Sequence, residues 1–248
     1  MAGKVLVAGS HGGIIAAHLG AKAGVHALIL NDAGLGKDRA GIAGLVYLEE
    51  IGMAAAAVDC MSARIGDGAD MLARGVISHA NVYAAFCDVA AGQSCRDAAE
   101  RMCGAAVPRA APPPYAEGRW RVSDRTPEVW ALDSVGKVEP ADAGRILLIG
   151  SHGALLGGRR ESALPVDAAA AVFNDAGIGA DRIGITRLPV LAARGVPAAT
   201  VDCMSARIGD GRSMWESGLI SHMNAVALQM DVAHGMSVRQ FVEVIRAR

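Results

Sequence analysis

Val58 to Gly68 reads VDCMSARIGDG, and the same eleven residues recur from Val201 to Gly211. Identity over so long a run marks an internal repeat, which organises the rest of the chain. Shorter polar motifs recur on both sides of this run. Most recur 143 residues later, as the run itself does, whereas the first of them recurs 141 residues later, so the second copy has two extra residues after it. These motifs are Gly-Ser-His-Gly at 9–12 and 150–153, Asn-Asp-Ala-Gly at 31–34 and 174–177, and Ser-His-x-Asn at 78–81 and 221–224.

Each copy alternates short apolar runs with stretches of helical periodicity, which predicts β-α-β units with right-handed crossovers. The expected fold class is α/β, with two tandem Rossmann-like repeats related by a pseudo-two-fold axis, each a mostly parallel sheet flanked by helices. Ser94 and Ser237 are expected helix N-caps. The expected strands are 4–8, 26–30, 54–58, 76–77, 145–149, 168–173 and 198–201, and the expected helices are 13–23, 39–51, 81–90, 94–102, 224–232 and 237–248.

The expected domain organisation has three parts. Residues 1–103 form the first α/β repeat, and residues 145–248 form the second. The segment 104–144 between them is rich in proline, which predicts an extended linker. The run from Val129 to Asp133 within it predicts an added strand that has no counterpart before the first copy. The sequence allows this strand to join the sheet of either half.

Composition narrows the class of protein. Hydrophobic residues make up 52% of the chain, and the formal net charge is −1 with no basic stripe, which argues against nucleic-acid binding. No apolar run predicts a membrane span or a signal peptide. The five cysteines are an odd number without framework spacing, which indicates reduced thiols and a cytoplasmic protein. We expect a homo-oligomer that acts on a small molecule.

Three of the repeated motifs directly follow expected strands. The carboxyl ends of parallel strands meet at one edge of a sheet, and ligands bind there, so motifs that are far apart in sequence should converge. Glycines such as Gly9 and Gly12 permit close approach of the backbone, and free amides at this turn would favour an anion. Aspartates at strand ends are costly to bury without partners, which makes a functional role plausible for Asp32 and Asp59.

The repeated polar residues supply the candidate site. In the leading hypothesis, serines act as nucleophile or oxyanion partner, histidines as bases, aspartates as orienting groups or metal ligands, and arginines as binders of a substrate carboxylate. The catalytic candidates are Ser10, His11, Asp32, Asp59, Cys60, His79, Ser151, His152, Asp175, Asp202, Cys203 and His222; the substrate-binding candidates are Gly12, Asn31, Ser62, Arg64, Asp67, Asn81, Gly153, Asn174, Ser205, Arg207, Asp210 and Asn224.

The reaction class expected first is hydrolysis of a C–N bond in a small carboxylated or amide-bearing metabolite. No cofactor is required by the pattern, although histidine and aspartate ligands would suit a divalent metal, zinc or manganese. The layout of one cysteine in each half resembles that of two-base amino-acid racemases and epimerases, which implies Cys60 and Cys203 as opposed acid and base. The motifs around the cysteines differ from that family, so no family is assigned. The third hypothesis is a non-catalytic protein that binds a small anion.

Overall fold

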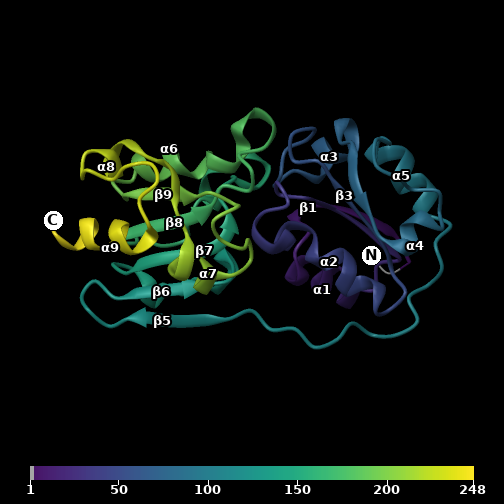
Figure 1. The fold of residues 1–248 in the computed structure, drawn as a ribbon, viewed down its shortest axis with the longest axis horizontal. Helices are drawn as coiled ribbons and strands as arrows, with labels where there is room; N and C mark the ends of the chain where they lie inside the picture. Colours follow the sequence, from purple (N-terminus) through teal and green to yellow (C-terminus); the bar gives the residue numbers. More distant parts are fainter. Residues whose placement is uncertain (1–2) are drawn as a thin grey trace. The chain divides into compact units, whose positions relative to one another are not determined.

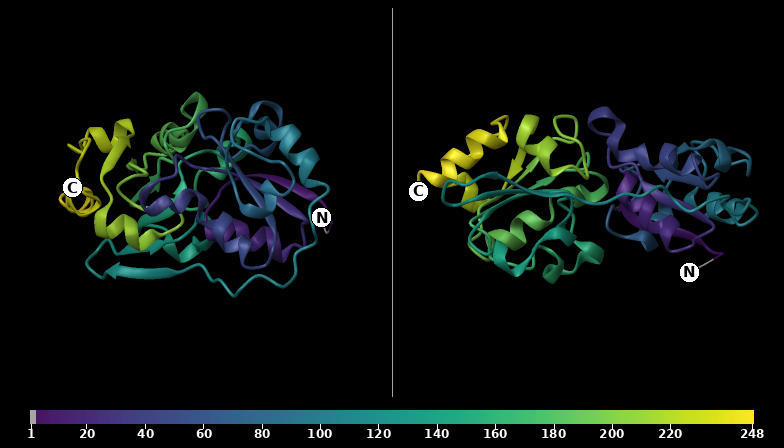
Figure 2. Two further views of the ribbon diagram at one scale, coloured as in Figure 1. Left: turned by 45° about the vertical axis from the view of Figure 1, so that its right-hand side comes forward. Right: turned by 90° about the horizontal axis from the view of Figure 1, so that it is seen from below.

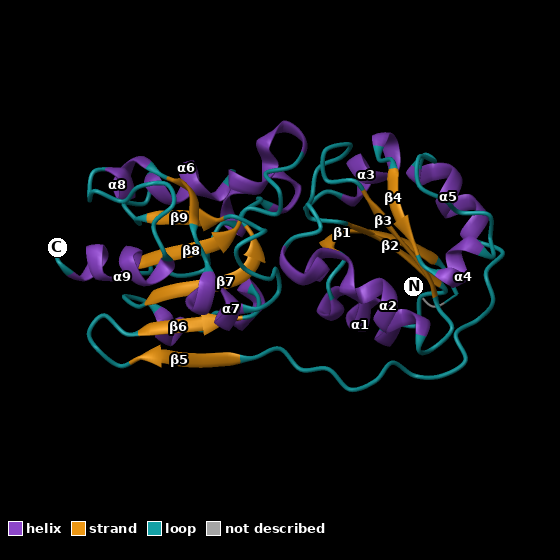
Figure 3. Ribbon diagram, viewed as in Figure 1, coloured by secondary structure: helices purple, strands orange, loops and turns teal. Residues whose placement is uncertain are grey.

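The computed structural model describes residues 3–248, which form two compact units. The chain is α/β, with two mixed sheets of four and six strands that are flanked by helices (Figures 1 and 3). Unit 1 comprises Met1–Leu35, Arg39–Ala116 and Gly179–Asp181, and unit 2 comprises Gly36–Asp38, Glu117–Ile178 and Arg182–Arg248.

Unit 1 is built on a sheet in the order β1-β2-β3-β4, in which the first three strands are parallel and β4 is antiparallel. Strands β2 and β3 are fully buried, as their continuous apolar runs require. Helices α1 and α2 cover one face of the sheet, and α3 and α5 cover the other. The elements are β1 Val5–His11, α1 Ile14–Lys22, β2 Ala27–Asn31, α2 Ala43–Glu49, β3 Ala54–Val58, α3 Gly68–Arg74, β4 Ile77–Ala80, α4 Val82–Ala85 and α5 Cys95–Met102.

Unit 2 has a larger sheet, in the order β10-β9-β8-β7-β6-β5. Strand β6, from the expected linker segment, pairs parallel with β7, and β5 pairs antiparallel with β6 at the edge, so the added strand belongs to this sheet. The elements are β5 Arg119–Ser123, β6 Val129–Leu132, β7 Ile146–His152, β8 Ala170–Asn174, α6 Arg187–Ala192, β9 Ala198–Val201, α7 Gly211–Ser217, β10 Ile220–Met223, α8 Ala225–Leu228 and α9 Val238–Arg246.

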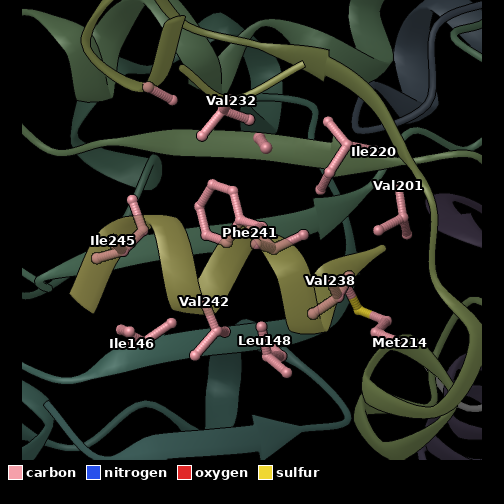
Figure 4. Packing of buried hydrophobic residues seen from close by; sticks show 14 of the residues in the cluster. Ile146, Leu148, Val201, Met214, Ile220, Val232, Val238, Phe241, Val242 and Ile245 are labelled. Atoms are coloured by element: carbon pink, nitrogen blue, oxygen red, sulfur yellow. The ribbon is translucent and has the colours of Figure 1, made fainter. Parts of the chain in front are cut away.

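The largest apolar cluster lies between α9 and the sheet of unit 2. Val242 of α9 points toward Ile146 and Leu148 of β7, whereas the Phe241 ring extends from the helix toward Val232 (Figure 4). Ser237 caps this helix, since its side chain accepts a hydrogen bond from the Gln240 amide, and Ser94 caps α5 in the same way. Both expected N-caps are confirmed. Within residues 3–248, none of the helices combines the length and apolarity needed to cross a membrane.

The strands follow one another in space in the order of the sequence within unit 1. This order differs from a Rossmann sheet, which reverses direction at a topological switch point. A crevice at such a point is therefore absent from the four-stranded sheet of unit 1. The ends of neighbouring strands, rather than a switch point, bring the polar motifs together in this fold.

The connection from β7 to β8 differs from the α1 helix of unit 1, because it holds only short 3₁₀ turns, Leu156–Gly158 and Arg160–Ser162. The packing also differs at one matched position. Gly44 of unit 1 lies so close to Ala17 of α1 that a Cβ atom would be 2.7 Å from the Ala17 Cβ. At the matching position in unit 2 stands Arg187, whose buried side chain donates to the carbonyl oxygens of Ala154 and Ser162 in the β7–β8 connection.

The segment after α5 crosses unit 1 without regular structure, and residues 105–118 contain neither helix nor strand (Figure 2). It is nevertheless attached to α2 and the turn that follows it. The Tyr47 hydroxyl donates to the Pro113 carbonyl oxygen over 2.6 Å, and the Arg109 amide donates to the Ile51 carbonyl oxygen over 2.8 Å. The prolines therefore form an extended tether, as their composition predicts.

Candidate functional site

Two carboxylates and a thiol meet at the carboxyl end of the sheet in unit 1. Asp32 follows β2, while Asp59 and Cys60 follow β3, and one oxygen or sulfur atom from each lies within 4.8 Å of the others. We call this group the acid–thiol cluster. Unit 2 contains the matching cluster of Asp175, Asp202 and Cys203, within the same limit. These six residues were all catalytic candidates from the sequence.

Backbone amides hold the buried carboxylate of each cluster in place. Oδ1 of Asp32 accepts hydrogen bonds from the amides of Gly34 and Cys60, each over 3.0 Å. Asp175 accepts the matching bonds from Gly177 and Cys203, also over 3.0 Å each. Because two backbone amides bind Oδ1, the loop fixes the orientation of the carboxylate. The position of Oδ2 is therefore fixed as well.

The loop after β2 has an unusual left-handed backbone. Ala33, Gly34, Leu35 and Gly36 have φ values of 50°, 73°, 63° and 67°. The matching loop of unit 2 places the β-branched Ile178 at φ 64°, a conformation that such residues rarely adopt. Strain of this kind persists only where the surroundings enforce it, and it gathers at functional sites.

A glycine near the end of the following 3₁₀ turn, Lys37–Ile42 in unit 1 and Ala180–Ile185 in unit 2, lets the chain pass close to the aspartate. A Cβ atom on Gly41 would lie 2.1 Å from the Asp32 carbonyl oxygen, and one on Gly184 would lie 2.0 Å from that of Asp175. The chain therefore folds tightly back over the aspartate in both units. This contact explains why Gly-Ile recurs at 41–42 and 184–185 beside the polar motifs.

Both cluster thiols are protonated at neutral pH. Burial raises the pKa of Cys60 from 9.0 to about 12, and the negative charges of Asp32 and Asp59 add to the effect. Burial likewise raises the pKa of Cys203 to about 12, with Asp175 and Asp202 contributing. An acid–base pair of thiols needs one thiolate, so these shifts oppose the use of the two cysteines as opposed acid and base.

The histidines of the Ser-His-x-Asn motif lie on the neighbouring antiparallel strands. His79 is on β4, where its Nδ1 lies 3.2 Å from the Ser78 hydroxyl oxygen. His222 is on β10, and its buried Nδ1 has no hydrogen-bond partner in the part of the chain that is described. Burial lowers the pKa of His222, and Arg182 lowers it further, against the opposing charge of Asp175.

Asp175 interacts with both His222 and Ser221. Burial raises the pKa of its carboxyl group, while hydrogen bonds from the Ser221 side chain and from the Gly177 and Cys203 amides act in the opposite direction. Ser221 also lies 3.1 Å from the hydroxyl of Thr200 on β9. A neutral histidine, a buried carboxyl group and a hydroxyl thus lie together at one edge of unit 2, where proton transfer is chemically feasible.

The histidines of Gly-Ser-His-Gly have a different environment. His11 and His152 are each 6% exposed, and their Nδ1 atoms accept from the backbone amides of Gly13 (3.1 Å) and Ala154 (3.3 Å). Burial lowers the pKa of His11 from 6.5 to about 4. A group with so low a pKa is a weak base, so in His11 the hydrogen bond that closes the turn is the better-supported role.

The glycine that ends the Gly-Ser-His-Gly motif uses its backbone amide within the turn in both units. The Gly12 amide donates to the Asn31 carbonyl oxygen over 2.7 Å, and the Gly153 amide donates to that of Asn174 over 2.8 Å, so neither is free for an anion. A Cβ atom on Gly12 would lie 2.5 Å from the Gly41 carbonyl oxygen.

The serines of this motif differ between the units. Ser10 is exposed near the end of β1, at the edge of its sheet. Ser151 is 8% exposed, and its hydroxyl oxygen accepts from the Val135 amide over 3.0 Å. Hydrogen bonding to the chain after β6 therefore accounts for Ser151, and a shared catalytic role for both serines has no geometric support.

Several substrate-binding candidates are bonded to the backbone around them. The Asn31 side chain donates to the Ala63 carbonyl oxygen and accepts from the Ala33 amide. Asn81 caps α4 and bonds to the Met53 carbonyl and the Ala55 amide. The matching residues Asn174 and Asn224 make equivalent bonds.

Turn and cap roles also account for the polar residues of the eleven-residue run. Asp67 is the N-cap of α3, and Asp210 is the N-cap of α7. The Ser62 hydroxyl donates to the Asp59 carbonyl oxygen and accepts from the Val76 amide, and Ser205 makes the matching pair of bonds with Asp202 and Leu219.

The two arginines of the run are paired with carboxylates. Within unit 1, Nε of Arg64 lies 2.8 Å from Oδ2 of Asp181, and the two side chains are 44% and 47% exposed. Within unit 2, Nη2 of Arg207 lies 2.9 Å from Oδ2 of Asp210. A substrate carboxylate would have to displace a partner that is already present.

Three residues near His222, namely Ser221, Arg182 and His234, were not among the catalytic or substrate-binding candidates. Ser221 and Arg182 recur as Ser78 and Arg39, and that recurrence was the signal that could have identified them. His234 acts on the pKa of His222 as a like charge but has Ala91 at its matching position, so the repeat could not reveal it.

Comparison of this chain with protein-family models, with curated proteins and with solved structures gives no match.

Proposed function

We propose that this protein is an enzyme that hydrolyses a C–N bond in a small carboxylated or amide-bearing metabolite. Its reaction centres are the acid–thiol clusters together with His79 and His222. The observation that supports the proposal is the meeting of two carboxylates and a thiol within 4.8 Å, with the same hydrogen bonds in both units.

The donor chemistry suits hydrolysis. Breaking an amide bond requires a base that takes a proton from water and an acid that returns it to the leaving nitrogen. A neutral histidine can do both in turn, and the lowered pKa of His222 keeps it neutral at physiological pH. The buried carboxylate of Asp175, 3% exposed, would orient the protonated form by its opposite charge. Arg182 adds a positive charge beside the same histidine, which would attract an anionic substrate.

The acid–thiol cluster also has the donors of a metal site. Two carboxylate oxygens and one thiolate fit zinc better than manganese, because the sulfur ligand is soft. A bound zinc ion would supply a Lewis acid and would deprotonate the thiol of Cys60 or Cys203. The chain's own contribution would be the fixed carboxylate orientation that the Gly34 and Gly177 amides impose.

The proposal keeps the broader expectations from the repeat. We take the two units to be descendants of one duplicated unit, Rossmann-like in their run of adjacent parallel strands alone and related by a pseudo-two-fold axis, in a homo-oligomer that works on a small molecule in the cytoplasm. The matching bonds at Asp32 and Asp175 support a common origin for the two sites.

The test combines histidine variants with a panel of small amides, imides and amino acids. Once a substrate is found, His79→Ala and His222→Ala should lower kcat by about 10²-fold or more if these residues are general bases. His18→Ala is the matched control, because His18 lies away from the cluster and bonds to the Tyr47 hydroxyl. Unchanged turnover in the double variant of His79 and His222 would refute the assignment.

Metal content distinguishes the two forms of the mechanism. Zinc at one or two ions per chain, lost in Asp59→Asn and Asp202→Asn together with activity, supports a metal-assisted reaction. Activity that survives chelation, with no metal bound, supports histidine acting alone. Binding of a small anion with no turnover on any substrate would favour the non-catalytic alternative and contradict the proposal.

A further inference from the structure

The two sheets differ most at one edge. Strand β7 of unit 2 is buried along all seven residues, because β6 and β5 continue the sheet beyond it. The matching strand of unit 1, β1, ends its sheet, and among residues 3–248 it pairs with β2 alone. Its residues from Val5 to Gly9 are partly exposed, and Ser10 is exposed.

The hydrogen-bonding groups of β1 indicate where the edge is open. The Lys4 carbonyl oxygen accepts from the His26 amide over 2.7 Å, so Lys4 faces β2. Since successive residues of a strand turn their backbone groups to opposite sides, Val5 and Val7 face away from the sheet. At the matching position in unit 2, the Ile146 amide donates to the Glu128 carbonyl oxygen over 2.9 Å. Gly68 lies against the Val7 carbonyl oxygen, so the open part of the edge is centred on Val5.

A hollow lies beside this edge. It has a volume of about 550 Å³, and Val5, Val7 and Leu72 contribute to its apolar wall. In unit 2, Val129 of β6 and Val122 of β5 pack beside Ile146 and Leu148, in the corresponding place. In unit 2 this place is therefore filled by short apolar strands whose side chains pack under the neighbouring helices.

From Val7 onward the edge is protected, because the pairing of β1 with β2 is irregular there and the Gly66 amide donates to the Gly9 carbonyl oxygen, whereas the start of the strand at Val5 is unprotected. Native sheets guard exposed edges with charges, prolines or bulges along the strand. The run Val5-Leu6-Val7-Ala8 carries neither charge nor proline. Lys4 and Arg96 on the rim of the hollow are positive and Glu100 is negative, so the same patch presents both signs. A two-fold interface needs such self-complementarity, because the identical surface supplies both sides.

We propose that the β1 edge binds the β1 edge of a second copy of this chain, antiparallel about a two-fold axis beside Val5. Val5 of each copy exchanges two backbone hydrogen bonds with its mate, and the two four-stranded sheets become one. A hairpin such as β5–β6 is a poorer occupant. Arg246 fastens that hairpin through the Ser123 hydroxyl and the Arg125 carbonyl, whereas the matching residue in unit 1 is Cys103.

The test is the mass of the purified full chain by light scattering and sedimentation equilibrium. We expect a dimer for the natural sequence and a monomer for Val5→Pro. Proline is tolerated at the first residue of an edge strand, and here it removes only an outward amide. Leu72→Glu, in the wall of the hollow on α3, is a second disrupting variant that leaves β1 intact. Val46→Glu is the control, since Val46 is 66% exposed on α2, across the sheet from the hollow.

Reversing the charges of Glu100 and Arg96 tests how the two β1 strands are aligned in the dimer. Glu100→Arg should weaken the dimer, and combining it with Arg96→Glu should restore the dimer. The inference is overturned if the natural chain is a monomer at its highest soluble concentration. It is also overturned if the dimer survives both Val5→Pro and Leu72→Glu, which would place the interface elsewhere. Folding of each variant is verified by circular dichroism before its mass is interpreted.

Discussion

Arg187→Met should destabilise unit 2, because the arginine is a fully buried cation that organises the loop between β7 and β8. Its side chain is 0% exposed, and it donates to the carbonyl oxygens of Ala154 (3.0 Å), Ser162 (2.5 Å) and Ala163. Its guanidinium carbon also lies 5.1 Å from the centre of the Phe173 ring. Methionine fills much of the volume but cannot donate, so three carbonyls would lose their partner.

The magnitude follows from two opposing effects. Hydrogen bonds to a charged group contribute roughly 1.5–3 kcal/mol each, so three of them amount to roughly 4.5–9 kcal/mol. Burial lowers the pKa of Arg187 from 12.5 to about 10. That shift corresponds to about 3 kcal/mol of desolvation, which the methionine variant would recover. The expected net loss is about 3 kcal/mol, with water entering the loop reducing it further.

The assay is urea unfolding followed by circular dichroism, with Arg194→Met as the control. Arg194 donates to the carbonyls of Leu164 and Val166 and pairs with Asp167, but its side chain is 30% exposed. Water can replace those bonds, so its loss should cost less than about 1 kcal/mol. Equal destabilisation by the two variants, or a loss below about 1 kcal/mol for Arg187→Met, would refute the argument from burial.

Four further predictions follow, of which two concern the thiols, one a helix cap and one the core. The pKa values of Cys60 and Cys203 rise from 9.0 to about 12 on folding, so their stabilising effect is complete below pH 9 and is lost as the pH rises from 9 toward 12. Each thiol should reduce the unfolding free energy by about 1.4 kcal/mol per pH unit in that window, and a Cys60→Ser, Cys203→Ser double variant should show a flatter pH profile. In the native chain at pH 8, iodoacetamide should modify the exposed Cys103 well before either cluster thiol, and equal rates would contradict their burial. Ser237→Ala should cost about 1 kcal/mol in thermal unfolding, because it removes the cap of α9. Phe241→Ala should cost about 3–5 kcal/mol by leaving a cavity in the unit 2 core, and a loss near zero would mean that α9 does not carry this packing.

The sequence was sufficient for the pattern of strands. The run Ala54–Val58 was predicted as a strand and is β3 with the same bounds, and Ala198–Val201 is likewise β9. Short apolar runs bounded by turn residues are a local signal, and buried parallel strands require them on both faces. The expected helix over 39–51 is instead a 3₁₀ turn followed by α2, because Asp38 and Arg39 adopt positive φ and Gly41 packs under Asp32.

The repeat alone found the polar residues but could not separate their roles. Asp59 and Asp67 recur equally, yet Asp59 belongs to the acid–thiol cluster while Asp67 caps α3. His11 and His79 also recur equally, although the first closes a turn and the second lies beside Ser78. A recurring letter reports that a position is used twice, whereas its hydrogen-bond partners are set by residues elsewhere in the chain.

By itself, the sequence determined that this protein is an α/β chain with a duplicated set of polar motifs at strand ends, because periodicity and identity are local properties. The tertiary structure decided which of those residues meet, which sheet receives Val129–Leu132, and which carbonyl groups the buried Arg187 binds. These outcomes depend on burial and on contacts between distant segments. Burial beside Asp32 raises the pKa of the Cys60 thiol. The placement of β6 next to β7 covers that strand, whereas β1 remains at the edge of its sheet.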